Sequence, residues 1–445
     1  MATQQDSSDR PHGSVNEPPF APHRWESGFG LPGVYYWSPQ QFAADIRRVF
    51  YRNWLFVGHT CQIPEPGDYF SFAIGRDSIL VVRDEASAVH ALFNSCRHRG
   101  SRLCDAPSGH MAKIVCPYHQ WVYGLDGSLQ SCRMMNEEID RSDYPLHQAR
   151  IEVVQGFIFF CLSDAAPDFK PARDAFDRFF APHDSENIRV ALEQEYLVEA
   201  NWKTIFDNNR ECYHCATGHR EFCLSNFDFG MPGDPRSSDE FVRENARMQE
   251  KWAALGLEQG PVNFPNGEWF RCMRFPLKPG FVTESLNGQP VAPVIGDFAD
   301  HDIGSLRVVG LPNMWFHLNS DYFMTTRLIP VAPTKTQVKV AWYVRRDAGA
   351  GVDFDPARVA DVWRITGEQD WKLCEMNQAG MQSTRFVPGP LSQEAEQGIS
   401  HFIGWYFRQL EGDTPAAELC GAAEDQAWFE ELQFEDLQQR NSVEG

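Results

Sequence analysis

Two short stretches decide how this chain folds: Cys96-Arg97-His98 and Cys116-Pro117-Tyr118-His119. Residues 99–115 separate them, and each stretch supplies one thiol and one imidazole in the same order. Such a repeated mixed pair indicates two short loops, each delivering one sulfur and one nitrogen ligand to a shared metal site.

This ligand set is that of a Rieske [2Fe-2S] cluster, in which one iron takes both cysteines and the other takes both histidines. Structural zinc sites instead repeat unmixed Cys-x2-4-Cys or His-x3-5-His pairs, and a chance cluster of core residues is the other alternative. Cys104 and His110 lie between the pairs as rival ligands, but neither belongs to a mixed pair, so we interpret both as structural. The predicted cofactor-binding residues are Cys96, His98, Cys116 and His119.

The composition narrows the kind of protein. A chain of 445 residues is long enough for two or three domains, and its hydrophobic content of 42% is sufficient for a packed core. The formal charge of −21 argues against a nucleic-acid or anionic-membrane surface, which would need basic patches. The 12 cysteines show no repeated framework, so we expect reduced thiols and metal ligands, and no disulfides.

The chain divides into four predicted segments. Residues 1–30 are rich in Ser, Pro, Asn and Gln and lack an apolar run long enough for a signal or a membrane span, which predicts a flexible tail on a cytoplasmic protein. Residues 31–53 form a helical lead-in, 54–163 form the Rieske domain, and 164–445 form a catalytic domain.

The pattern of short apolar runs broken by turn residues predicts a small antiparallel β-domain. The expected strands are Trp54 to Val57, Tyr69 to Ile74, Ser78 to Val82, Val89 to Phe93 and Ile151 to Phe160, preceded by a helix from Pro39 to Tyr51.

The second half mixes helices with strands. Helical stretches are expected near Arg173 to Phe180 and Trp202 to His219, followed by a Gly- and Pro-rich span from Asn226 to Asp297. Strands are expected over Leu306 to Leu318, Tyr322 to Val331 and Gln337 to Arg345, the last two forming a hairpin. Asp355-Pro356 is typical of a helix start and predicts a long helix to Met381. The predicted fold class is α+β.

A second metal site is indicated between Asn201 and His219. Mononuclear non-haem iron needs two imidazoles and one carboxylate on one face, with the remaining positions open. His214 and His219 can supply the imidazoles, although a spacing of five does not align on a regular helix. Gly218 permits the helix to end or bulge there.

The carboxylate must come from another segment. Asp370, on the predicted long helix, is a good candidate because aspartate is a poor interior helix residue. Spacing alone does not distinguish Asp370 from Asp361, Glu368 and Glu375 as the carboxylate ligand.

These motifs resemble the oxygenase component of the Rieske non-haem iron oxygenases, over the chain from about Tyr35 to Leu410. The resemblance implies a helix-grip catalytic domain with a central antiparallel sheet, a homotrimer, and an iron triad of His214, His219 and Asp370. It also implies that Glu211 bridges the cluster of one subunit to the iron of its neighbour. Asp207 and Asn208, in the same segment, are the other predicted catalytic residues.

Glu211, where ring-dihydroxylating members usually carry aspartate, resembles the branch acting on quaternary ammonium compounds such as glycine betaine, proline betaine and carnitine. Hydroxylation of an N-methyl group by O2 would give a carbinolamine that collapses to formaldehyde and the demethylated amine. No dinucleotide fingerprint or flavin motif is found, so a separate NAD(P)H-dependent flavin or iron-sulfur reductase is implied. The alternatives are an oxygenase of an aromatic or other apolar small molecule and a pure electron-transfer protein.

Overall fold

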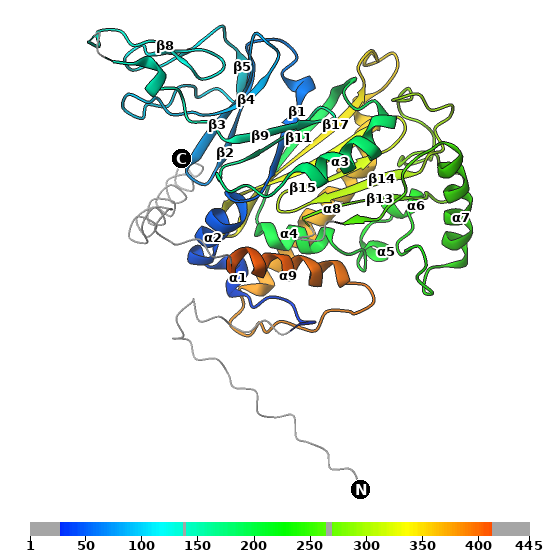
Figure 1. Cartoon of the computed structure of the whole chain (residues 1–445). Helices are drawn as coiled ribbons and strands as arrows, with labels where there is room; N and C mark the ends of the chain where they lie inside the picture. Colours follow the sequence, from blue (N-terminus) through cyan, green and yellow to red (C-terminus); the bar gives the residue numbers. More distant parts are fainter. Residues whose placement is uncertain (1–26, 137–138, 264–268, 412–445) are drawn as a thin grey trace, which may run out of the picture.

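The computed structural model describes residues 27–136, 139–263 and 269–411. The predicted tail lies largely in residues 1–26, outside the described residues. Figure 1 shows a small β-rich part at the upper left and a larger body built around a central sheet, with helices α1, α2 and α9 gathered at its lower edge.

The smaller part contains three antiparallel sheets. Their strand orders are β1-β10-β9, β4-β3-β2-β5 and β6-β7-β8. The strands are β1 (Leu55–His59), β2 (Asp68–Ile74), β3 (Asp77–Arg83), β4 (Val89–Phe93), β5 (Ser108–His110), β6 (Ile114–Val115), β7 (Val122–Tyr123), β8 (Leu129–Ser131), β9 (Arg150–Val154) and β10 (Phe157–Cys161). The lead-in before them is α1 (Val34–Trp37), α2 (Pro39–Asp45) and a π-helical turn (Ile46–Phe50).

The body is built on one seven-stranded antiparallel sheet of order β11-β17-β16-β15-β14-β13-β12. Its strands are β11 (Ile188–Val198), β12 (Val262–Asn263), β13 (Phe270–Phe275), β14 (Ser305–Gly310), β15 (Met314–Leu318), β16 (Phe323–Ala332) and β17 (Lys335–Arg345). The helices around it are α3 (Lys170–Phe180), α4 (Trp202–Asn209), α5 (Cys215–Gly218), α6 (Phe222–Ser225), α7 (Asp239–Ala254), α8 (Pro356–Met381) and α9 (Gln397–Glu411). The predicted α+β fold, with a helix held against a central antiparallel sheet, is confirmed.

Helix α8 begins where the sequence predicts. The Asp355 carboxylate accepts a hydrogen bond from the Ala357 N–H at 2.9 Å, and Pro356 occupies the first turn, where no N–H partner is needed. The helix packs against β11 and α4, which places its middle beside the segment that carries His214.

One apolar core joins the two parts. Phe56 of β1 and Phe157 of β10 both pack on Phe316 of β15, with ring centroids 4.7 and 5.0 Å apart. Asn313 reinforces this junction, because its side chain donates to the Phe56 carbonyl and accepts from the Phe56 N–H, both at 3.0 Å. The cluster loops therefore stand on a part that is firmly packed against the body.

Several predicted elements need correction. The runs Ile151 to Phe160 and Leu306 to Leu318 are each two strands, because turns at Gln155-Gly156 and at residues 311–313 interrupt them. The helical stretch from Trp202 to His219 is broken between α4 and α5.

The Gly- and Pro-rich span from Asn226 to Asp297 also contains regular structure that was not predicted, namely α7 and β13. Helix α7 is capped by Ser238, whose hydroxyl accepts from the Phe241 N–H at 3.1 Å. Among the described helices, none combines the length and the apolar character needed to cross a bilayer.

Candidate metal centres and active-site cavity

The two cluster loops have the same backbone construction. In the first, the Cys96 N–H donates to the Ser101 carbonyl at 2.9 Å, and the Gly100 N–H donates back to Cys96 at 2.9 Å. In the second, the Cys116 N–H donates to the Trp121 carbonyl at 2.8 Å, and the Gln120 N–H donates back to Cys116 at 3.0 Å. Gly100 and Gln120, each four residues after a cysteine, have φ of 73° and 59°. Each loop thus turns sharply and brings its cysteine and histidine to the same side.

The four side chains lie close together within the small part. Cys96 and Cys116 are buried at 3% and 1% exposure, while both histidines remain half-buried. The His98 and His119 rings lie 4.7 Å apart between centroids, and His98 stacks on Trp121 at 4.9 Å.

The site has the properties that a Rieske cluster needs. His98 Nδ1 is buried without a hydrogen-bond partner, as expected of a nitrogen reserved for a metal. Tyr123 Oη lies 3.3 Å from Cys96 Sγ, where a hydroxyl would stabilise a sulfur ligand and tune the cluster.

The rival ligands have other partners. Cys104 Sγ contacts Tyr69 Oη at 3.0 Å, and His110 Nδ1 lies 3.0 Å from an Asp68 carboxylate oxygen. Both contacts belong to the sheet beneath the loops, in agreement with their interpretation as structural residues.

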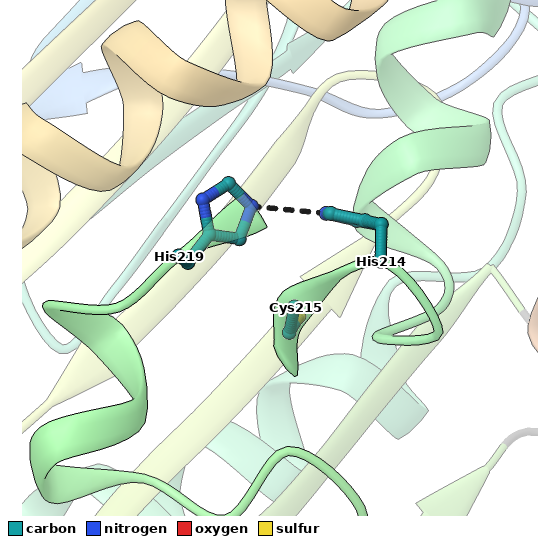
Figure 2. A group of neighbouring side chains, drawn as sticks. All are labelled: His214, Cys215 and His219. Carbon is teal, nitrogen blue, oxygen red and sulfur yellow. Dashed lines mark hydrogen bonds between the residues drawn. The ribbon is translucent and has the colours of Figure 1, made fainter. Parts of the chain in front are cut away.

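The second site is formed where α4 ends and α5 begins. Asn201 caps α4, accepting from the Lys203 N–H at 2.9 Å, and the helix ends at Asn209. In the turn that follows, the Glu211 carboxylate accepts from the backbone N–H groups of Tyr213 and His214. This interruption of the helix lets His214 and His219 face each other despite their spacing of five, as Figure 2 shows.

Three potential ligand atoms converge. His214 Nε2 lies 3.0 Å from His219 Nε2 and 3.2 Å from Asp370 Oδ1, and His219 Nε2 lies 2.8 Å from the same oxygen. The structure therefore brings together His214 and His219 from the α4–α5 segment with Asp370 from the middle of α8.

The outer hydrogen bonds fix which ring nitrogens carry protons. His214 Nδ1 lies 2.5 Å from Glu211 Oε1, and His219 Nδ1 lies 2.9 Å from Gln369 Oε1. The Gln369 amide donates from Nε2 to Glu221 at 3.1 Å, so its oxygen must face His219. Both Nδ1 atoms are therefore donors in the neutral rings, and both Nε2 lone pairs point toward Asp370. Three acceptors facing one point are the arrangement that a cation stabilises.

The electrostatics of this group also favour a bound cation. Burial alone would lower the pKa of His214, but hydrogen bonds and charge from Asp370 and Glu211 raise that pKa to about 9. Asp370 likewise raises the pKa of His219 against the effect of burial. Burial would raise the pKa of Asp370, yet the two rings hold it below its usual value. The two carboxylates that favour protons on these rings would equally favour a metal ion, which takes the place of the protons at the Nε2 atoms.

The remaining predicted residues are placed differently. Asn208 Nδ2 lies 3.2 Å from His214 Nε2, beside the three converging atoms. Asp207 points instead toward the lead-in helix, where it accepts a 2.6 Å hydrogen bond from Tyr36 Oη, and its other oxygen has no hydrogen-bond partner among the described residues. The role of Gln369 was not predicted; its position next to Asp370 is the only sequence signal that could have indicated it.

One prediction about cysteines was wrong. Cys212 and Cys215 form a disulfide across the turn that carries His214. Their Cα atoms lie 4.9 Å apart, within the range of about 4.4–6.8 Å that a disulfide requires. Local proximity in a Cys-x-x-Cys turn allows this bond even where no disulfide framework exists. The Cys215 sulfur lies within 4.8 Å of the ring nitrogens, but as a disulfide sulfur it is not a thiolate ligand.

A cavity of about 500 Å³ opens onto the triad. Strands β13, β14 and β15, helix α8, the α4–α5 segment and the start of α9 line it. Its aromatic lining residues are Phe222, Phe227, Phe229, Trp269, Phe275, Trp315, Trp363 and Phe402. Its lining arginines are Arg210, Arg236, Arg271 and Arg307. This volume is suited to a small organic molecule.

Together, a cysteine–histidine loop pair and a two-histidine, one-carboxylate triad beside a cavity define an iron-dependent oxygenase fed by a Rieske cluster. Residues 53–149 match the model of the Rieske [2Fe-2S] domain, and residues 185–412 match that of the ring hydroxylating alpha subunit (catalytic domain). The chain belongs to the Rieske non-haem iron oxygenase family, as an oxygenase component, and its cofactors are a [2Fe-2S] cluster and mononuclear iron.

Individual relatives agree with this assignment. The chain is 38% identical to the glycine betaine monooxygenase oxygenase subunit of Chromohalobacter salexigens, over 87% of this chain and 88% of the relative. It is 36% identical to the subunit of the same name from Pseudomonas aeruginosa, over 86% and 90%. The fold matches the quaternary ammonium Rieske monooxygenase CntA in complex with L-carnitine, with a TM-score of 0.63, 20% identity, and coverage of 86% of this chain and 96% of that one.

Proposed function

We propose that this chain is the terminal oxygenase component of a monooxygenase that hydroxylates an N-methyl group of a small quaternary ammonium compound such as glycine betaine. The observation that carries the proposal is the cavity on the triad, which combines aromatic walls with guanidinium groups. Aromatic faces attract a permanent cation that cannot accept hydrogen bonds through its nitrogen. The similarity to glycine betaine monooxygenase oxygenase subunits supports the same substrate class.

The metal-binding residues follow from the donor atoms. His214, His219 and Asp370 would hold the mononuclear iron through Nε2, Nε2 and a carboxylate oxygen, leaving positions open toward the cavity. The cluster would be held by Cys96 and Cys116 on one iron and by His98 and His119 on the other. When bound, the cluster supplies single electrons and the iron supplies dioxygen activation.

The protein groups around the iron position and shield the reaction. Glu211 and Gln369 hold the two imidazoles in the tautomers that leave Nε2 free. The Asn208 amide, 3.2 Å from His214 Nε2, lies where it can hydrogen-bond a small molecule at the open face. Trp315 and Phe402 add buried apolar surface to the cavity lining, where they would limit the access of water.

The proposed reaction balances with an external reductant. One substrate C–H bond, O2, two electrons and two protons give a C–OH group and water. The resulting carbinolamine then breaks its C–N bond, giving formaldehyde and the demethylated amine. A separate NAD(P)H-dependent reductase would deliver the electrons, in agreement with the relatives being named as oxygenase subunits.

A homotrimer that passes electrons between subunits is part of the proposal. Figure 1 places the small β-rich part that carries the cluster loops and helix α5 toward opposite sides of one subunit, which favours electron transfer from a neighbouring copy. Tyr118 in the second cluster loop and Tyr213 beside the triad are exposed at 57% and 71%, as expected of residues that meet a partner. Glu211, which directly precedes Cys212-Tyr213, would then bridge the two centres.

The experiment is a turnover assay with the purified chain, a flavin-dependent reductase, NAD(P)H and two substrate panels. Glycine betaine, proline betaine and carnitine form one panel, and benzoate-type aromatic acids form the other. Formaldehyde released with a quaternary ammonium compound, in step with O2 consumption, supports the proposal. Hydroxylated aromatic products without formaldehyde from any betaine would replace it with the alternative of an aromatic-substrate oxygenase.

A further inference from the structure

Four arginines line the active-site cavity, and two of them are neutralised by acidic residues. Arg236 Nε donates to Asp234 at 2.8 Å and its guanidinium lies 3.6 Å from Glu394. Arg307 lies 3.7 Å from the buried Glu284 and also donates to the Asn226 side chain. These two side chains are therefore occupied within the protein.

Arg210 and Arg271 differ from this pair. Neither forms an ion pair or a side-chain hydrogen bond with a residue in the part of the chain that the structure describes. Arg210 directly follows the last residue of α4 and precedes Glu211, and Arg271 of β13 is part of the cavity lining. Burial lowers the pKa of both guanidiniums, and the charge of Arg271 lowers that of Arg210 further, to about 10. Both remain charged at neutral pH.

Two partly buried cations without a counter-ion are unfavourable unless a ligand compensates them. A carboxylate is suited to this role, because guanidinium groups bind it through two parallel N–H donors. No other pair of arginines in the described lining is left uncompensated.

Another part of the cavity wall is electron-rich. Trp363 of α8 lines the cavity, and its indole N–H donates to Glu284 at 3.1 Å. Contacts with His317, Arg307 and Asn319 hold the pKa of Glu284 at about 2 despite its burial, so this carboxylate is ionised. An indole that donates to a carboxylate gains electron density, which strengthens attraction of a cation to its ring. Asp370 adds negative charge at the triad.

We propose that Arg210 and Arg271 form a carboxylate clamp that holds a zwitterionic substrate with its carboxylate at these guanidiniums and its trimethylammonium group toward the triad and the aromatic wall. The clamp rests on the proposed function and deepens it: it makes the carboxylate a requirement and separates betaines from alcohols such as choline. An apolar aromatic substrate would leave both arginines uncompensated.

The test is equilibrium binding by calorimetry to the cluster- and iron-loaded enzyme, without oxygen or reductase. Glycine betaine and choline carry the same trimethylammonium group, and only betaine carries the carboxylate. The wild-type enzyme should bind betaine at least about 10-fold more tightly than choline, and Arg271→Gln should weaken betaine binding by about 10- to 100-fold while changing choline binding less than about threefold. Arg271→Lys keeps the charge but loses the two parallel N–H donors. Its affinity for betaine should lie between those of the wild type and Arg271→Gln.

Arg236→Gln is the matched control, because it removes a cavity arginine that is already paired. It should change betaine and choline binding alike. Equal affinities of the wild-type enzyme for the two ligands, binding of neither ligand, or an equal loss for both in Arg271→Gln, would overturn the clamp. If Arg271→Gln does not retain the cluster absorbance, the clamp is tested by betaine binding to Arg271→Lys and by the ratio of betaine to choline affinity in the wild type.

The clamp and the proposed function can fail separately. Wild-type enzyme that releases formaldehyde from betaine yet binds choline equally well would refute the clamp alone. Wild-type enzyme that binds betaine through Arg271 but never releases formaldehyde would refute the function alone.

Discussion

Glu211 Oε1 lies 2.5 Å from Nδ1 of His214, while the other oxygen of the same carboxylate accepts from the backbone of the turn. One side chain thus fixes both the tautomer of a proposed iron ligand and the loop that carries it. Since the carboxylate is 11% exposed, it also borders the outer surface of the subunit. Outer hydrogen bonds of this kind commonly change metal affinity or activity by about 10- to 100-fold.

Replacing Glu211 by glutamine is expected to spare both metal centres and slow electron transfer between them. The amide is isosteric and can still orient His214, but it lacks the charge and cannot relay a proton. We expect product formation in a single turnover to slow by about 10- to 100-fold. Rapid-mixing absorbance of the reduced cluster, with product quantified on the same timescale, measures this.

Glu186→Gln controls for the loss of a carboxylate, because Glu186 is exposed and distant in sequence from both centres. It should leave single-turnover rates unchanged. Wild-type rates in Glu211→Gln would contradict the bridging role.

Asp370→Asn should remove the mononuclear iron and leave the cluster. The carboxylate is the only anionic member of the proposed triad, so its loss weakens cation binding most. The measured iron content should fall from about three to about two irons per subunit, and the visible spectrum of the cluster should be retained. Asp361→Asn, on the same helix, should keep about three. Equal iron content in both variants would show that Asp370 is not a ligand.

Gln369→Met should lower iron affinity because His219 loses the acceptor that fixes its tautomer. A decrease of about 10- to 100-fold is expected, measured by competition with a chelator. Gln369→Glu retains an acceptor at the same position and should hold iron at least as well as the wild type. Loss of iron from both variants to the same extent would indicate a packing effect instead.

The buried carboxyl group of Asp207 should make the stability of the protein depend on pH in an unusual direction. Burial raises its pKa to about 7, against the opposing effects of Tyr36 and Lys203. The unfolded chain releases this proton above its ordinary value of 3.8, whereas the folded chain retains it up to about 7, so this residue lowers stability as pH rises between these values. Asp207→Asn should remove this decrease in stability, raising the free energy of unfolding at pH 8 by roughly 1–4 kcal/mol.

Thermal unfolding of wild type and Asp207→Asn between about pH 4 and 8 measures the effect. The two curves should converge at the acid end and separate toward pH 8. Asp105→Asn, at an exposed carboxylate, should follow the wild type throughout. Parallel curves for Asp207→Asn and the wild type would contradict the raised pKa.

Local signals in the sequence predicted much of this fold. Asp355-Pro356 predicted the start of α8, because capping and the fixed φ of proline act within one turn, and the end expected near Met381 is also confirmed. The mixed Cys–His pairs predicted the cluster, since a ligand set is a chemical property that needs no tertiary information. The family, fold class and cofactors that these residues indicated are confirmed.

Features that depend on contacts between distant parts of the chain could not be predicted from the sequence. Gln369 meets His219 across a separation of 150 residues, and the unpaired state of Arg271 depends on what the fold fails to bring near it. The break after α4 arises from Glu211 binding the backbone of its own turn, which overrides helix propensity. Spacing did not distinguish Asp370 from three other acids; the resemblance favoured it, and the packing of α8 on α4 brings it to the two histidines.

Oxidative N-demethylation by this chain is tested most directly by a single turnover without reductase. Chemically reduced enzyme is mixed with glycine betaine and oxygen, and formaldehyde, dimethylglycine and cluster oxidation are quantified together. Formaldehyde and dimethylglycine are expected in equal amounts as the cluster reoxidises, and neither product is expected from Asp370→Asn although its cluster still reoxidises. Cluster oxidation in the wild type without formaldehyde, or formaldehyde from Asp370→Asn at the wild-type level, would contradict this activity.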